Sequence, residues 1–189
     1  MEINTQLLFD DTVSFTQAVR SIDNLKFAEQ YAPSLNILPR PLEVSLGAIA
    51  NSHINIDSIS IPRLTSDIAV IVTKRLLVQT PDVTTRGTVR SKFMDSSERN
   101  IGFALHANRA AIIDIEIADR PGETMAHEIG HLIGVQAFSD GVLGIHCDQD
   151  ICIMAAYNDP TIEQSSFCED CSDEMLVKSE QLAMKLSRR

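Results

Sequence analysis

Residues 127–154 read HEIGHLIGVQAFSDGVLGIHCDQDICIM, and the interpretation of the whole chain starts from this stretch. His127 and His131 are four residues apart, a spacing that returns to nearly the same face of an α-helix, because one turn takes about 3.6 residues. Two imidazoles on one face can bind one metal ion, and Glu128 then lies beside that metal rather than on it. The pattern predicts a helix with two metal ligands and a carboxylate placed as a general base for water.

The composition is that of an ordinary globular domain. The chain has 189 residues, of which 44% are hydrophobic and 22% charged, so a sizeable core is expected. The net charge is −10 and no Lys/Arg block is present, so we expect no nucleic-acid binding. No apolar run approaches the length of a membrane span, and residues 1–11 lack the pattern of a signal peptide. We therefore predict a cytoplasmic protein without membrane association.

A helix is predicted near the N-terminus. Ser14 and Gln17 form a capping-box pattern, and apolar residues follow at helical spacing over residues 14–30 until Pro33 stops the helix. Two later stretches are rich in polar residues and are predicted as loops, residues 50–66 and 79–99.

Four strands are predicted between the first helix and the metal helix. Residues 42–46 alternate apolar and polar positions, which is typical of a half-buried strand. Residues 67–73 form a continuous apolar run that suits a central strand. Residues 101–106 and 110–117 are predicted as a hairpin, so residues 101–106 form an antiparallel edge. An open edge above a metal site can bind an extended peptide by strand addition.

The metal helix has a start signal and a stop signal. Pro121 suits a first helical turn, and Gly134 suits a left-handed C-terminal cap. A last helix is predicted after Asp173. Strands followed by a helix that packs on them indicate an α+β domain with a twisted sheet.

All four cysteines fall between residues 147 and 171. In a chain without a secretion signal, this clustering favours a metal site over disulfides, although buried thiols or two short disulfides stay as the alternative. Three imidazoles leave one position of a tetrahedral zinc open for water, whereas four thiolates fill it, so the two kinds of site differ in chemistry.

Three motifs, HEIGHLIG, HCDQDICIM and FCEDC, together resemble the archaemetzincin family of zinc metallopeptidases. The resemblance implies a metzincin-type twisted mixed sheet with an antiparallel edge strand, a backing helix and an active-site helix. It also implies a catalytic zinc bound by His127, His131 and His146, with Glu128 as the general base for zinc-bound water. A second, structural zinc would be bound by four thiolates, those of Cys147, Cys152, Cys168 and Cys171.

The same resemblance gives supporting roles to residues around the zinc. Gly134 would end the active-site helix, and Met154 would form the Met-turn, an apolar floor below the catalytic zinc. Tyr157 is a candidate to hydrogen-bond the oxyanion or approach the zinc, and an ordinary surface or core role is its alternative. We predict an N-terminal subdomain, residues 1–134, and a zinc-stapled C-terminal subdomain, residues 135–189, within one catalytic domain.

One position departs from the family pattern. The third His of that pattern corresponds to Ala137 here, and His146 comes nine residues later, so residues 135–145 form an enlarged loop. A fourfold longer connection costs only about 1.2 kcal/mol in closure entropy, whereas structural zinc binding contributes on the order of 10 kcal/mol. We therefore keep His146 as the third ligand, tethered by Cys147, with Asp140 as the alternative oxygen ligand.

These features predict a zinc-dependent metallopeptidase that acts on peptide or protein substrates. The sequence leaves endopeptidase and aminopeptidase action open. The alternative is a catalytically weak or inactive zinc-stabilised protein that binds peptides on its edge strand. An intact Glu128 favours the peptidase, because a binding protein has no need of a general base.

Overall fold

A computed structural model describes residues 2–46, 49–50, 53–56, 59–61, 64–78, 101–135, 146–155 and 164–188. Several predictions fall outside these residues and stay predictions: the loop 79–99, nearly all of the enlarged loop 135–145, and the roles of Tyr157 and Asp140.

The main sheet is mixed and has six strands. Its order is β2-β1-β6-β9-β8, and β3 also pairs with β1. All pairings are parallel except that of β8 with β9, so the predicted antiparallel edge strand is confirmed. The strands are β1 (Ile3–Phe9), β2 (Leu35–Ile37), β3 (Leu42–Glu43), β6 (Ile68–Thr73), β8 (Gly102–Leu105) and β9 (Ala110–Asp114).

A second, smaller sheet corrects one prediction. Its strands are β4 (Ile49–Ala50), β5 (His53–Asn55) and β7 (Leu76–Val78), so the stretch 50–66 is not simply a loop. Strands of two or three residues are too short to give a clear alternating pattern, and the signal here is the pair of buried residues Ile54 and Ile56 on either side of Asn55. His53, which had no predicted role, lies in β5.

The predicted strand 42–46 is also shorter than expected, since only β3 pairs as a strand. Leu42 is exposed, whereas Leu46 is buried and Val44 packs against the core, so the apolar alternation reflects burial of an irregular segment. The second hairpin strand ends at Asp114, because its carboxylate accepts a hydrogen bond from the backbone N–H of Glu116 at 3.0 Å and starts a turn.

The helices follow the predicted order. They are α1 (Phe15–Leu25), extended by the 3-10 helix η1 (Lys26–Gln30), then α2 (Pro121–Ile133) and α3 (Glu169–Leu186). The capping box at Ser14 is present, Pro121 is in the first turn of α2, and Gly134 has φ 90°. Helix α3 begins four residues before the predicted Asp173; two acidic residues in its first turn suit the helix dipole.

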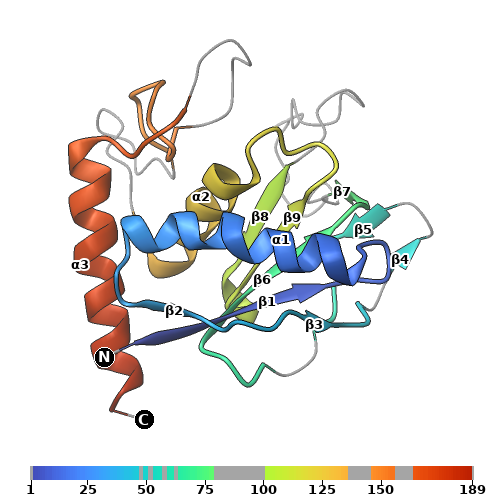
Figure 1. The fold of residues 1–189 in the computed structure, drawn as a ribbon. Helices are drawn as coiled ribbons and strands as arrows, with labels where there is room; N and C mark the ends of the chain where they lie inside the picture. The colour runs from blue at the N-terminus through green and yellow to red at the C-terminus, as the bar shows by residue number, and fades with distance from the viewer. Residues whose placement is uncertain are drawn as a thin grey trace, which may run out of the picture.

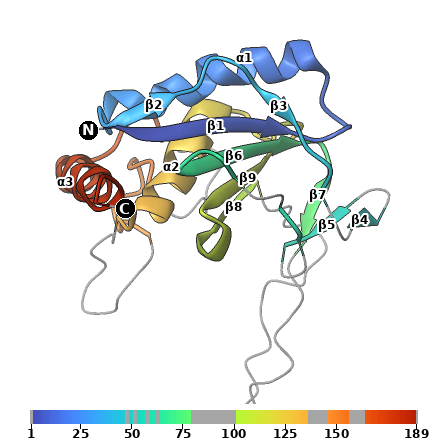
Figure 2. The same cartoon turned by 90° about the horizontal axis from the view of Figure 1, so that it is seen from below.

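The two faces of the main sheet pack against different layers. Alternate residues of β1 separate between them: Ile3, Leu7 and Phe9 join the core shared with the helices, and Leu8 joins the core that also contains Ile54. Helix α1 packs against α2, and α3 runs beside the start of β1 (Figure 1). Figure 2 shows α1 and the small sheet at opposite sides of the molecule.

One core joins the segments before and after Gly134. Met125 of α2, Met154 and Met175 of α3 are all fully buried in the same cluster. Among the described residues, none of the helices combines the length and the hydropathy needed to cross a bilayer.

Candidate active site and metal centres

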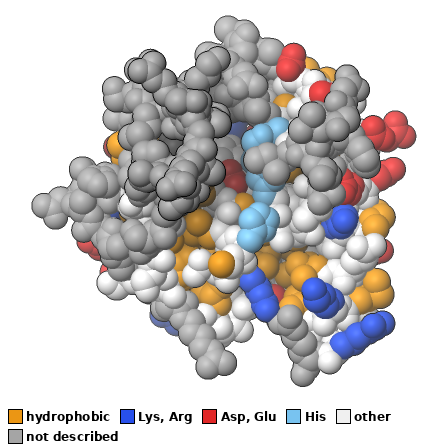
Figure 3. Space-filling model, turned by 180° about the vertical axis from the view of Figure 1, so that it is seen from behind, with side chains coloured by type: hydrophobic (Ala, Val, Ile, Leu, Met, Phe, Trp, Pro, Cys, Tyr) orange, Lys and Arg blue, Asp and Glu red, His pale blue; other side chains and the backbone are white. Residues whose placement is uncertain are grey.

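Helix α2 presents His127 and His131 on one face, with their Nε2 atoms 2.9 Å apart. His146, distant in sequence, completes the group: its ring centroid lies 5.2 Å from that of His127 and 5.1 Å from that of His131. One nitrogen from each ring lies within 4.8 Å of those of the others. The structure therefore brings together the three imidazoles that the sequence singled out, here called the histidine group. Figure 3 shows His side chains gathered in one strip on this face.

The orientation of His127 is fixed from outside the histidine group. Its Nδ1–H donates a hydrogen bond to the backbone carbonyl of Ile153 at 2.5 Å. The tautomer that makes this bond leaves a lone pair on Nε2, the atom that faces His131. This is the arrangement by which proteins orient a histidine toward a metal.

Burial keeps these rings neutral. Desolvation lowers the pKa of His127 to about 4 and that of His131 to about 3, and it also lowers the pKa of His146. Neutral imidazoles are metal ligands, whereas imidazolium ions are not. A tetrahedral zinc places its ligand nitrogens about 3.3 Å apart, so the histidine group fits a zinc ion.

His106 adds a fourth ring to this neighbourhood. It is exposed at the start of the 3-10 helix η3 (His106–Asn108), directly after β8. It is near enough to contribute, after burial and the two other rings, to the lowered pKa of His131. Its exposure agrees with a solvated ring at the margin of the site.

Glu128 lies next to the histidine group and is almost completely buried, with 7% of its surface exposed. Desolvation raises the pKa of its carboxyl to about 8, because burial disfavours the charged form. Its side chain contacts the edge strand at Gly102. A buried carboxyl with a raised pKa beside a metal-ligand group is typical of a proton-transferring residue.

Met154 forms an apolar floor against α2 between the two helical histidines. It is fully buried, and a Cβ built on Gly130 would lie 2.6 Å from its sulfur. The helix therefore approaches Met154 so closely because residue 130 has no side chain. Whether Met154 forms a Met-turn below a zinc ion stays a prediction.

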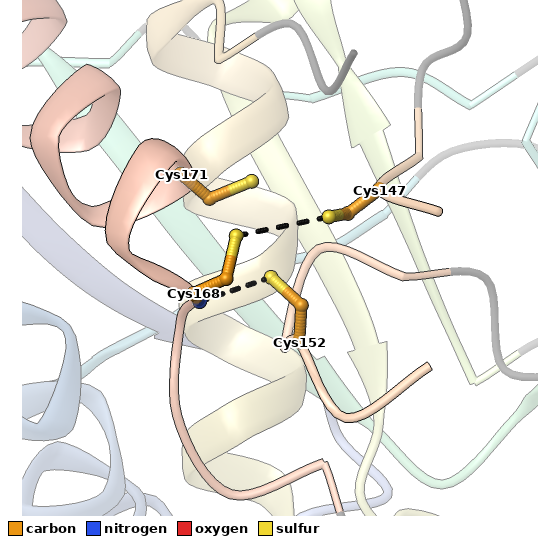
Figure 4. A group of neighbouring side chains, drawn as sticks. All are labelled: Cys147, Cys152, Cys168 and Cys171. Carbon is orange, nitrogen blue, oxygen red and sulfur yellow. Dashed lines mark hydrogen bonds between the residues drawn. The ribbon is translucent and has the colours of Figure 1, made fainter. Parts of the chain in front are cut away.

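The second group consists of Cys147, Cys152, Cys168 and Cys171, here called the cysteine group. All four are free thiols, and their sulfurs lie within 4.8 Å of one another. Figure 4 shows the sulfurs turned toward a common centre, two from a loop and two from the start of α3. The Sγ atoms of Cys147 and Cys168 are 3.8 Å apart, which matches the about 3.8 Å edge of a tetrahedral zinc–thiolate site with Zn–S near 2.3 Å.

Backbone N–H groups stabilise the thiolate form of one of these cysteines, Cys152. Cys152 Sγ accepts hydrogen bonds from the N–H groups of Cys168 at 3.3 Å and Met154 at 3.4 Å. With the neighbouring thiol of Cys171 as the largest cause, these contacts lower the pKa of Cys152 to about 5. Burial raises the pKa of Cys147 to about 11. The lowered pKa of Cys152 favours its thiolate, which is the form that binds a metal.

The two groups are joined by a short segment. His146 and Cys147 are adjacent in sequence, and the N–H of Cys147 donates to the carbonyl of Met154 at 2.8 Å. The carbonyl that orients His127 belongs to Ile153, which directly follows Cys152. Any change at the cysteine group therefore reaches two members of the histidine group through one or two residues.

Three residues of the site had no role in the sequence interpretation: Gly102, Gly130 and Ile153. The two glycines carry a signal, since an isolated glycine inside a strand or helix pattern indicates close approach of another group. The role of Ile153 is played by its carbonyl, which no side-chain pattern reveals.

Solved structures of known proteins share this fold. An archaemetzincin from Methanopyrus kandleri matches with a TM-score of 0.63 and 14% identity, over 97% of this chain and 96% of that one. A zinc-dependent peptidase from Methanocorpusculum labreanum matches with a TM-score of 0.55 and 15% identity, over 90% and 99%. An archaemetzincin from Archaeoglobus fulgidus, complexed with malonate, matches with a TM-score of 0.54 and 17% identity, over 90% of this chain and 99% of that one.

The fold is therefore that of zinc-dependent peptidases. More particularly, it is the archaemetzincin fold, so the resemblance seen in the motifs is confirmed at the level of the fold, as is the predicted α+β class. No family model matches the chain, and no curated protein matches it in sequence.

Proposed function

We propose that this chain is a zinc-dependent metallopeptidase that hydrolyses peptide bonds, with His127, His131 and His146 as ligands of the catalytic zinc. The observation that carries the proposal is the convergence of three neutral imidazoles next to a buried Glu128, on the fold of zinc-dependent peptidases. A structural protein has no need of a buried carboxyl at such a place.

Each residue has one task in this proposal. Zinc held by the histidine group supplies Lewis acidity for water and for the scissile carbonyl. Glu128 accepts a proton from the attacking water and delivers it to the leaving amine. The pKa of Glu128, raised to about 8 by burial, falls when a dication is bound beside it, so the carboxylate can act as a base at neutral pH. Ile153 holds His127 in the ligand tautomer.

The edge strand offers a binding mode for the substrate. Within the described residues, β8 pairs on one side with β9 and with no strand on its other side. An extended peptide can add to such an edge through main-chain hydrogen bonds, and its side chains then determine specificity. Glu128 contacts β8 at Gly102, so a peptide on this edge lies within reach of the base.

The cysteine group supports a second, structural zinc, which gives two zinc ions per chain. Four thiolates fill the coordination sphere and leave no position for water, so this site has no catalytic task. We further propose the division into subdomains at Gly134, with residues 135–189 organised by this zinc.

A peptide-library digest of zinc-loaded protein, analysed by mass spectrometry, tests the proposal. We expect cleavage by the unaltered chain and a loss of about 10²- to 10⁴-fold in the Glu128→Ala variant, the usual effect of losing a general base. Zinc content should be equal in both. Glu180→Ala, at an exposed position of α3, is the matched control and should cleave normally.

The products also separate the remaining alternatives. Internal cleavage products indicate an endopeptidase, and stepwise loss of N-terminal residues indicates an aminopeptidase. Fully zinc-loaded protein that binds peptides from the library and cleaves none would contradict the proposal and identify a zinc-stabilised peptide-binding protein instead.

A further inference from the structure

The edge strand and the general base meet at one residue without a side chain. Gly102 is the first residue of β8, and its partner on β9 is Ile113. A Cβ built on Gly102 would lie 3.0 Å from Glu128 Oε1 and 3.1 Å from Glu128 Cγ. It would also lie 3.0 Å from Ile113 Cδ1. Contacts this short are tighter than nine in ten real Cβ contacts, so a side chain at position 102 forces a neighbour to move.

Backbone conformation does not explain this glycine. Among the described residues, Gly134 is the one glycine with a positive φ. Gly102 therefore has a φ that other residues adopt easily, and a glycine in a strand normally weakens it. The close approach of the Glu128 side chain, together with that of Ile113 Cδ1, is the remaining physical reason for a residue without Cβ.

The backbone of the elements around Gly102 is held in place, so side chains must move instead. Strand β9 is buried along its whole length and pairs with both β6 and β8. Helix α2 is fixed by the buried residues Met125, Ala126 and Ile129, which flank the site. With strand and helix both held, a Cβ at position 102 displaces side-chain atoms: Oε1 and Cγ of Glu128, and Cδ1 of Ile113.

We propose that Gly102 is a positioning residue for Glu128: the bare backbone of β8 provides the space in which the carboxylate lies beside the histidine group. The catalytic meaning of this contact rests on the proposed peptidase function, whereas the steric contact itself does not. The strand that is proposed to receive the substrate thus also sets the position of the base.

A double-mutant cycle on thermal stability tests the steric contact without any measurement of activity. Gly102→Ala in the unaltered chain should lower the Tm by several degrees (~3–8 °C), the effect of overpacking in a chain of this size. In the Glu128→Ala background the same substitution should cost little or raise the Tm, since the space is then empty. Equal costs in both backgrounds would overturn the proposal, because the clash would then involve Ile113 alone.

Gly122→Ala is the matched control for this cycle. A Cβ at Gly122 would lie 3.2 Å from the carbonyl oxygen of Asn24 and 3.3 Å from Phe27 Cβ. Its nearest neighbours do not include Glu128. Its effect on the Tm should be the same with and without the Glu128 side chain.

Steady-state kinetics test the positioning role. Zinc-loaded Gly102→Ala should lose about 10- to 100-fold in kcat, the effect of a misplaced reacting group, while KM changes less than about threefold and zinc content stays the same. Adding Ile113→Val, which removes the crowding Cδ1 atom, should restore part of kcat. An unchanged kcat, or a rise in KM alone, would overturn the positioning role. If the unaltered chain cleaves nothing, the peptidase function fails, and the stability cycle still decides the contact.

Discussion

The histidine group and the cysteine group lie one residue apart in sequence and are built in opposite ways. Two of the three histidines come from one regular helix whose buried face belongs to the main core. The cysteines come from an irregular segment and the first turn of α3, and the isolated bridges Cys147–Ala155 and Cys152–Ser166 are the β pairings described there. Two residues of the histidine group are therefore held by a regular helix. The cysteine group lies on segments with little regular secondary structure, which a bound metal would help to fold.

This difference predicts which of the two groups would depend on a bound metal for its structure. Helix α2 has a capped C-terminus and buried apolar residues that hold His127 and His131 without any ion. The loop of residues 146–155 also buries Cys152, Ile153 and Met154, but its described residues form no helix or paired strand, and metal bound there would contribute directly to folding free energy. Loss of metal should consequently leave His127 and His131 in place on α2 and disorganise the cysteine group, with the adjoining His146.

The largest expected effect comes from Cys168→Ser. The variant should lose the tightly held zinc and several kcal/mol of stability, or ~10 °C and more in Tm, because binding at such a site is folding free energy. It should also weaken zinc at the histidine group, since His146 and Ile153 adjoin cysteine ligands. Elemental analysis and thermal unfolding measure both effects. Ser172→Ala, one residue beyond Cys171, is the control, and two native disulfides found by mass spectrometry in fresh protein would contradict the metal site.

The next effect concerns the third histidine. His146→Ala should weaken the more easily chelated zinc by more than about 100-fold, since loss of even an outer partner of a ligand costs 10- to 100-fold. The Tm of the rest of the chain should change little, because His146 is half-buried and α2 holds the other two rings. Asp140→Ala should leave the affinity nearly unchanged. The opposite pattern, or a carboxylate of Asp140 within about 2.2 Å of the zinc, would show a site rebuilt around an oxygen ligand.

The sequence predicts local geometry well and contacts between distant segments poorly. The spacing of His127 and His131 fixes their common face because a helix is periodic, and the hairpin of β8 and β9 follows from two adjacent apolar runs. The short strands β4 and β5 gave no periodic signal, and the polar stretch of residues 50–66, which contains β5, was wrongly interpreted as a loop.

Contacts across the site were missed for the same reason. The crowding at Gly102 joins residues 26 positions apart, and the hydrogen bond from His127 to Ile153 also spans 26 positions. Neither follows from a local pattern. The early start of α3 was missed as well. Cys171 already belongs to the helix and its side chain is buried, a position that depends on the surrounding fold.

A third test separates the two groups by metal removal. Fully loaded, reduced protein should contain two zinc ions, and mild chelation should remove the zinc of the histidine group first, since one coordination position there is open. The secondary structure should survive this first step, with a shift of only a few degrees in Tm, about what moderate ligand binding contributes. Elemental analysis and circular dichroism follow the two steps. A loaded preparation with one zinc at most, or simultaneous loss of both ions with unfolding, would contradict the comparison.

The smallest expected effect arises where the two groups share packing. Gly130→Ala places a Cβ 2.6 Å from the Met154 sulfur, so the buried methionine must move. Overpacking typically costs about 1–3 kcal/mol, and replacing a helical glycine by alanine returns up to about 1 kcal/mol. The net loss should therefore be at most about 2 kcal/mol, or a few degrees in Tm.

The position of Met154 in the chain makes Gly130→Ala a test of the link between the two groups. Met154 shares a backbone segment with Ile153, the hydrogen-bond partner of His127, and with Cys152, so its movement disturbs both groups through their common link. Gly130→Ala should accordingly weaken zinc at the histidine group by about 10-fold, within the range for loss of an outer partner, and leave the zinc of the cysteine group bound. The same substitution in a Met154→Ala background should be neutral or stabilising, because the new Cβ then enters vacated space. If zinc affinity is unchanged while the Tm falls, Met154 is a packing residue without influence on the histidine group, and the link between the two groups runs through Ile153 and His146 alone.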